Sequence, residues 1–157
     1  MERNGLEKIK TIGDAYLAVC GLPLENEQHG IKAVRTRIEI MEFTNRRRKE
    51  GGKFEKRIGI NSGAFVAGIV VVNKFAYNIW GDTVNTALRM ESSGESGKIN
   101  ISETTCELVK DHFHCISRGK IEAKHKGMVD MYFVERRAGD MSKMTVANDI
   151  GSSLEVT

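Results

Sequence analysis

The segment from residue 77 to residue 90 constrains the fold of this chain more than any other part of it. It begins as a short apolar run, makes a Trp-Gly turn and continues with the pattern of a helix. Asp82 or Thr83 is expected to cap that helix by accepting a hydrogen bond from a free backbone N–H. The segment therefore predicts a strand, a tight turn and a helix over about residues 83–91.

The other elements are predicted from hydrophobic periodicity and from turn residues. A hairpin is expected over residues 7–20 with its turn at Gly13-Asp14, followed by a helix over residues 27–49. Strands over 53–62 and 64–72 are expected to pair with each other, and the four apolar residues 69–72 indicate that the second strand is buried. Shorter elements follow: strands at 98–101, 113–116, 119–123 and 131–134, and a helix at 103–109. This order predicts an α+β fold, with helices packed on one face of a mainly antiparallel sheet.

Length and composition indicate one globular domain. The chain has 157 residues, of which 40% are hydrophobic and 29% are charged, enough for a core and unlike a disordered segment. The domain is expected to span residues 1–137. Residues 138–157 form a polar tail without sustained periodicity, which is expected to be mobile.

Charge and hydropathy exclude several classes of protein. A net charge of +3 is too small to indicate nucleic acid as the main partner. No run of about 18 apolar residues is present, so no membrane segment is expected in this chain. Three cysteines without paired spacing are expected to be free thiols, which favours a cytoplasmic location.

Two places in the pattern suggest phosphate or metal chemistry. Asn85 and Arg89 lie four residues apart, so both side chains leave the same face of the predicted helix. An amide beside a guanidinium suits a sugar-phosphate, although in an arbitrary helix such a pair is more often solvated surface. Asp14 stands at a hairpin tip, where a carboxylate can reach a hard cation such as Mg²⁺ or can bond to its own turn backbone.

Four segments, in this order, resemble the catalytic domain of the class III nucleotidyl cyclases, the adenylyl and guanylyl cyclases. They are KIKTIGDAYLAVCGLP (8–23), RIGINSGAFVAGIV (57–70), YNIWGDTVNTALRM (77–90) and KHKG (124–127) followed by MYFV (131–134). The resemblance covers residues 5–135. It implies a ferredoxin-like core with a β-rich extension, and an enzyme that converts ATP to cyclic AMP and pyrophosphate in signal transduction.

The resemblance also implies roles for individual residues. Asp14 matches one of the family's two metal-binding aspartates, which together hold two Mg²⁺ or Mn²⁺ ions. Asn85 matches the residue that orients the ribose, and Arg89 matches the residue that holds the phosphate in the transition state. Lys126 matches the lysine that meets the terminal phosphates; without the resemblance it is equally typical of a solvated loop.

Base selection is implied at two positions. Lys10 matches the family lysine that contacts adenine, where guanylyl cyclases carry a glutamate. Asn78 stands where adenylyl cyclases commonly have Asp or Thr, and its amide can either accept or donate a hydrogen bond. ATP is therefore the favoured substrate, and guanylyl specificity is the alternative.

One part of the family pattern has no counterpart in this sequence. The first strand of the family sheet, which carries the other metal aspartate, would precede the hairpin, where this chain has only residues 1–5 and nothing that matches that strand. We therefore expect a partial catalytic domain that is inactive or weakly active by itself. A non-catalytic nucleotide-binding or dimerising module is the alternative from another class.

The resemblance implies a homodimer with its sites at the interface. In the family, sites form between two catalytic domains that face each other. Asp14 would come from one copy, and Asn85 and Arg89 from the other.

Overall fold

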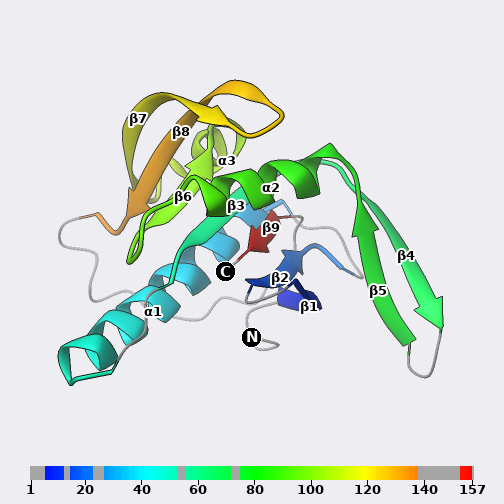
Figure 1. The fold of residues 1–157 in the computed structure, drawn as a ribbon, viewed down its shortest axis with the longest axis horizontal. Helices are drawn as coiled ribbons and strands as arrows, with labels where there is room; N and C mark the ends of the chain where they lie inside the picture. The colour runs from blue at the N-terminus through cyan, green and yellow to red at the C-terminus, as the bar shows by residue number, and fades with distance from the viewer. Residues whose placement is uncertain are drawn as a thin grey trace.

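The computed structural model describes residues 6–12, 15–22, 27–52, 56–71, 75–137 and 153–156, which form two sheets and three helices (Figure 1). The helices are α1 (His29–Lys49), α2 (Asp82–Ser92) and α3 (Glu103–Val109). The strands are β1 (Leu6–Ile12), β2 (Ala15–Cys20), β3 (Ile58–Ser62), β4 (Val66–Val71), β5 (Phe75–Trp80), β6 (Ile99–Ser102), β7 (His114–Ala123), β8 (Gly127–Glu135) and β9 (Ser153–Val156). Within the described part of the chain, no helix is long and apolar enough to cross a membrane.

The larger sheet has seven strands in the order β1-β2-β9-β3-β6-β8-β7. All neighbouring strands are antiparallel except β3 and β6, which run parallel. Helices packed on a mainly antiparallel sheet confirm the predicted α+β class. The predicted hairpin around residues 13–14 and the three predicted helices are also confirmed, with ends shifted by two residues or fewer.

The helices divide between the two faces of this sheet, whereas the sequence predicted one face. Ile58 and Ile60 on β3 pack in one core cluster with side chains of α1 and α3. Gly59 between them points the opposite way, because successive residues of a strand face opposite sides of the sheet. A Cβ atom at Gly59 would lie 2.0 Å from the backbone nitrogen of Glu91, so α2 lies directly on that opposite face.

The strand after β3 does not pair with β3 as predicted. β4 instead pairs with β5, from Val66 opposite Trp80 to Val71 opposite Phe75, in a separate two-stranded ribbon (Figure 1). The Thr83 hydroxyl donates to the carbonyl of Ala64, which directs the chain after Ser62 towards the start of α2. The predicted burial of residues 69–72 lies outside the described side chains.

The predicted strands at 113–116 and 119–123 form a single strand, β7. Its register against β8 shifts between Ser117 and Gly119, and Gly119 has a φ of +72°. A glycine with positive φ is suited to a bulge, which interrupts the ladder without ending the strand. Gly119, where the sequence predicted the start of a second strand, therefore marks an irregularity within the single strand β7.

Residues from the predicted polar tail contribute a strand to the middle of the larger sheet. β9 lies between β2 and β3 and is antiparallel to both, with Val156 opposite Leu17 on one side and opposite Gly59 on the other. An interior position of this kind satisfies the backbone groups of two strand edges at once. No strand was predicted here, because the four alternating residues SLEV are too short to stand out. The rest of residues 138–157 lies outside the described residues.

None of the three cysteines forms a disulfide, as predicted. Cys106 is buried in the cluster between α1, α3 and the sheet, and half-buried Cys115 hydrogen-bonds to it. Burial raises the pKa of the Cys106 thiol. Burial, and then the bond to Cys106, raise the pKa of Cys115 to about 12.

Neither Cys106 nor Cys115 is expected to react with iodoacetamide at pH 8 while the protein is folded. The thiolate is the attacking form, and a raised pKa leaves very little of it at that pH. Unfolding in urea removes the burial, so both thiols are then expected to react fully. Peptide mass spectrometry after each treatment measures this, and equal labelling of Cys115 in both states would contradict the packing described here.

Candidate active site

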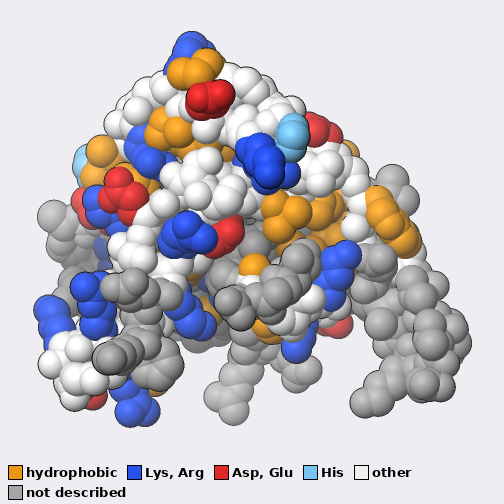
Figure 2. All heavy atoms as spheres, viewed as in Figure 1, with side chains coloured by type: hydrophobic (Ala, Val, Ile, Leu, Met, Phe, Trp, Pro, Cys, Tyr) orange, Lys and Arg blue, Asp and Glu red, His pale blue; other side chains and the backbone are white. Residues whose placement is uncertain are grey.

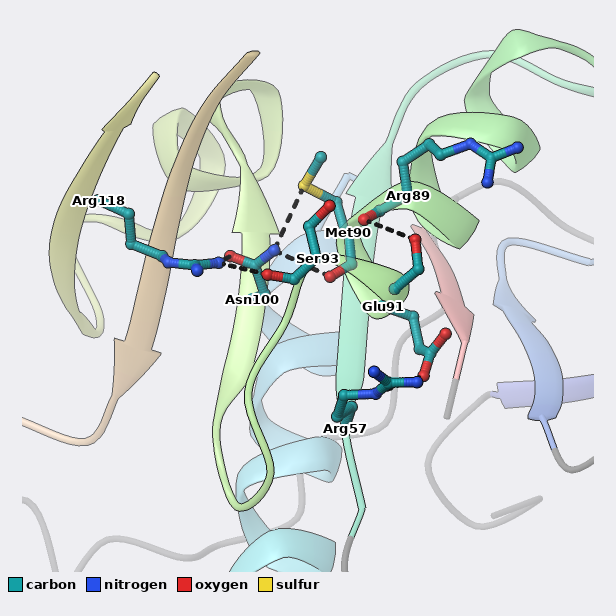
Figure 3. Close-up of polar contacts among 8 residues, drawn as sticks. Arg57, Arg89, Met90, Glu91, Ser93, Asn100 and Arg118 are labelled. Atoms are coloured by element: carbon teal, nitrogen blue, oxygen red, sulfur yellow. Dashed lines mark hydrogen bonds and ion pairs between the residues drawn. The ribbon is translucent and has the colours of Figure 1, made fainter. Parts of the chain in front are cut away.

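Helix α2 carries the two residues singled out in the sequence, Asn85 and Arg89, on one face. Asn85 is exposed in the helix, and its backbone N–H donates to the carbonyl of Gly81 at 3.4 Å. Arg89 is half-buried in the last turn, and its guanidinium extends away from the polar contacts at the helix end (Figure 3). The helix therefore presents an amide donor and acceptor one turn away from a cationic fork.

The start of α2 differs from the predicted cap. The N-cap residue is Gly81 with a φ of +129°, a conformation that favours glycine, and no side chain caps the helix. The Thr83 hydroxyl donates a hydrogen bond to the carbonyl of Ala64 and so does not cap the helix. Asp82 lies in the first turn, and its side chain is exposed. A carboxylate in the first turn is still favourable, because it faces the positive end of the helix dipole.

Lys126 approaches the same end of α2 from the turn between β7 and β8. Its ammonium forms an ion pair with the Asp82 carboxylate. The Lys126 side chain is 19% exposed whereas that of Asp82 is 83% exposed, so the lysine is the more fixed partner. His125 and Gly127 on either side of it have φ values of +66° and +71°, which form the tight turn that directs the lysine. The sequence did not indicate Asp82 as this partner.

A buried asparagine fixes α2 near its start. Asn61 on β3 donates from Nδ2 to the carbonyl oxygen of Thr83 at 3.0 Å. Its Oδ1 accepts hydrogen bonds from the hydroxyls of Ser102 at 2.6 Å and Thr104 at 3.1 Å. Because a buried amide is costly to leave unpaired, these three bonds hold the helix start, β3 and the start of α3 in one arrangement.

The residues expected to read the base lie on two adjacent strands. Lys10 is exposed on β1, opposite Leu17 and just after a break in the register of that hairpin. Asn78 lies on β5 with its backbone opposite Gly68, and its side chain lies outside the described residues. β1 and β5 contact each other although they belong to different sheets. The strands that carry these two sequence positions therefore contact each other.

The expected metal ligand, Asp14, lies outside the described residues. β1 ends at Ile12 and β2 begins at Ala15, so residues 13 and 14 are the whole connection of this hairpin. In the described part of the chain, no three His, Cys, Asp or Glu side chains gather into a group that could hold a metal ion. A single hairpin carboxylate fits a cation such as Mg²⁺, which keeps waters and takes few protein ligands.

Residues 1–136 match the family described as the adenylate and guanylate cyclase catalytic domain. The chain is 39% identical over 142 residues to the receptor-type guanylate cyclase gcy-5 of Caenorhabditis elegans, which covers 85% of this chain and 13% of that protein. It is 33% identical over 135 residues to an adenylate cyclase of Mycobacterium tuberculosis, which covers 85% of this chain and 30% of that protein. The chain thus spans less than a third of the length of either curated relative.

A solved structure supports the same relationship. The guanylate cyclase domain of RhGC from Catenaria anguillulae, determined in complex with GTP, is 36% identical with a TM-score of 0.73, over 87% of this chain and 75% of that one. This similarity confirms the ferredoxin-like α+β core. By sequence and by fold, the chain belongs to the adenylate and guanylate cyclase catalytic domain family.

Proposed function

We propose that this domain converts a nucleoside triphosphate, preferably ATP, into the 3′,5′-cyclic nucleotide and pyrophosphate. The observation that carries the proposal is the contact between Lys126 and Asp82. Through it a lysine from the β7–β8 turn meets the helix that bears Asn85 and Arg89. Two cations and an amide at one helix suit a triphosphate joined to a ribose.

Each of these side chains has a role that follows from its chemistry. The Lys126 ammonium would bind the terminal phosphates and leave its contact with Asp82 as it does so. The Asn85 amide would hydrogen-bond the ribose and hold its 3′-hydroxyl towards the α-phosphate. The Arg89 guanidinium would donate two parallel hydrogen bonds to phosphoryl oxygens as negative charge grows on them.

The reaction also needs the 3′-hydroxyl to lose its proton. Asp14 is the residue that would hold a divalent cation, Mg²⁺ or Mn²⁺, in the complete site. When bound, such ions supply positive charge that favours the alkoxide and the departing pyrophosphate.

Adenine is the proposed base because Lys10 supplies a donor at the expected reading position. A ring nitrogen of adenine can accept that hydrogen bond, whereas a reader of the guanine N–H groups would need an acceptor there. The second candidate is guanylyl cyclase activity, which the similarity to gcy-5 and to the RhGC domain favours. The contact between β1, which carries Lys10, and β5, which carries Asn78, supports a shared role of the two positions in either case.

An assay of the full-length protein with ATP and GTP in parallel tests the proposal. We expect cyclic AMP to form from ATP, and kcat/KM to be higher for ATP than for GTP. Preference for GTP would transfer the proposal to guanylyl cyclase activity. If both nucleotides bind and neither is cyclised, the domain is instead a non-catalytic nucleotide-binding module.

Changing both base-reading positions, by Lys10→Glu with Asn78→Cys, is expected to shift preference from ATP towards GTP. A glutamate accepts hydrogen bonds where the lysine donates them, and mismatched polar groups in a site discriminate strongly. The ratio of kcat/KM for the two nucleotides measures the shift. Lys8→Glu, on the same strand, is the matched control and should leave the ratio as it is. An unchanged ratio in the double variant would show that neither position reads the base.

We further propose that two copies form the site as a homodimer. Asp14 of one copy would face Asn85 and Arg89 of the other, which gives two equivalent sites. Hydrophobic side chains are exposed between α2 and the start of the β4–β5 ribbon (Figure 2). Trp80, at the junction of that ribbon with α2, is 49% exposed, and such a side chain is suited to an interface.

A further inference from the structure

Two side chains of the larger sheet bind the carbonyl end of α2 (Figure 3). Fully buried Asn100 on β6 donates from Nδ2 to the carbonyl oxygen of Met90 at 2.8 Å. Arg118 on β7 donates from Nη1 to the carbonyl oxygen of Ser93 at 2.9 Å and to Oδ1 of Asn100 at 3.0 Å. A continuous set of hydrogen bonds therefore joins β7, β6 and the end of the helix.

The charge of Arg118 is directed at the helix rather than at a carboxylate. Its guanidinium lies 4.3 Å from the ring centroid of Phe133 and 4.0 Å from the sulfur of Met131. In the described ranges of the chain, no acidic side chain forms an ion pair with it. A cation at a helix C-terminus complements the dipole, and its hydrogen bonds to carbonyl oxygens are stronger than those of a neutral donor.

The turn that Arg118 binds is the turn that carries Arg89. The N–H of Ser93 donates to the carbonyl of Arg89 at 2.9 Å, and the hydroxyl of Ser92 donates to the same oxygen at 3.3 Å. Arg118 is therefore linked to Arg89 through the backbone of Ser93, whose carbonyl accepts from Arg118 and whose N–H donates to the carbonyl of Arg89. Its own guanidinium lies on the other side of the helix end from that of Arg89 (Figure 3).

We propose that Arg118, with Asn100, is a positioning residue that fixes the last turn of α2 and so aims the guanidinium of Arg89 at the reacting phosphate. This inference rests on the proposed role of Arg89. Packing of α2 against Gly59 sets the distance between the helix and the sheet. The two side chains then fix how its final turn is rotated, which decides where a long side chain on that turn ends.

The first test replaces Arg118 by methionine in the full-length protein. The variant keeps an unbranched apolar stem beside Phe133 and loses every hydrogen-bond donor. We expect kcat to fall roughly tenfold to a hundredfold, because a misplacement of about 1 Å has that effect. KM is expected to change less than twofold, because Arg89 acts on charge that exists only in the transition state. Arg118→Lys, which keeps the charge and a donor, should recover part of kcat.

The control substitution is Arg57→Met. Arg57 forms an ion pair at 3.2 Å with Glu91 of the same turn, and its side chain is 47% exposed. Arg57 binds a side chain rather than the helix carbonyls. The kcat of Arg57→Met should therefore stay within about twofold of the wild-type value.

A double variant separates positioning from a general loss of structure. If Arg118 acts through Arg89, then Arg118→Met in an Arg89→Ala background should lower kcat no further. An additional tenfold loss in that background, or a wild-type kcat in Arg118→Met, would overturn the inference. If Arg118→Met does not fold, Arg118→Lys decides: a lower Tm with an unchanged kcat means a purely structural role. Full activity of Arg89→Ala alone would instead overturn the proposed function.

Discussion

Arg89→Ala in the full-length protein is expected to lower kcat by about 10²–10³ with little change in stability. Removal of one donor to charge that develops in the transition state has an effect of this size. The interactions described for Arg89 that hold the helix are made by its backbone carbonyl, which the substitution keeps. Steady-state kinetics gives kcat, and thermal unfolding gives the stability.

Arg89→Lys refines this prediction. A lysine keeps the charge but not the planar pair of donors, so kcat should lie between those of the wild type and of Arg89→Ala. Arg57→Ala serves as the control, because it removes an exposed cation from the same end of the helix. A turnover near that of the wild type in Arg89→Ala would show that another group stabilises the phosphoryl charge.

The sequence correctly predicted those helices and strands that are determined by residues close together in the chain. The hairpin around residues 13–14 follows from a two-residue turn between β-rich runs, and α1 follows from its long helical period. Ser102 before α3 accepts from the N–H of Thr105, as a capping serine should. In each case the residues that determine the element lie within about one turn of one another.

Patterns failed where a long-range contact decided the outcome. The sequence at Ser62-Gly63 resembles a hairpin turn, but Thr83 and Asn61 together hold the following chain against α2, so β4 pairs with β5. Thr83 could not cap the helix for the same reason, since its hydroxyl is used elsewhere. β9 depends on two strand edges far away in sequence, which no window of neighbouring residues can detect.

The candidate site shows the same division. The spacing of Asn85 and Arg89 was enough to place both on one face of a helix. The partner of Lys126 and the pair that holds the helix end were not predicted, because their contacts join residues 10 to 44 apart. One signal was available for Asn100: it is a polar residue between two isoleucines of a buried strand. Such a residue needs a buried partner, but the pattern does not say which one.

Gly59→Ala is expected to lower the free energy of unfolding by about 3 kcal/mol or more, at the upper end of what overpacking costs. The added Cβ would lie 2.0 Å from the backbone nitrogen of Glu91 and 2.5 Å from the carbonyl carbon of Met90. Backbone atoms cannot rotate away as a side-chain end can, so α2 as a whole would have to move off β3. Urea unfolding followed by circular dichroism measures the loss.

Gly30→Ala makes the same chemical change on α1 and separates this effect from a general intolerance of added methyl groups. There the Cβ would lie 3.2 Å from the Cβ of Leu108 and 3.4 Å from Cγ1 of Val109, so α3 would have to give by only a few tenths of an ångström. Alanine also favours a helix over glycine, by up to about 1 kcal/mol in a helix interior, which offsets part of the closer contact. Stability of Gly30→Ala should therefore stay close to that of the wild type. Equal stabilities for the two variants would mean that α2 does not lie directly on β3. The placement of Asn85 and Arg89 relative to the sheet would then have to change as well, because the same helix carries both.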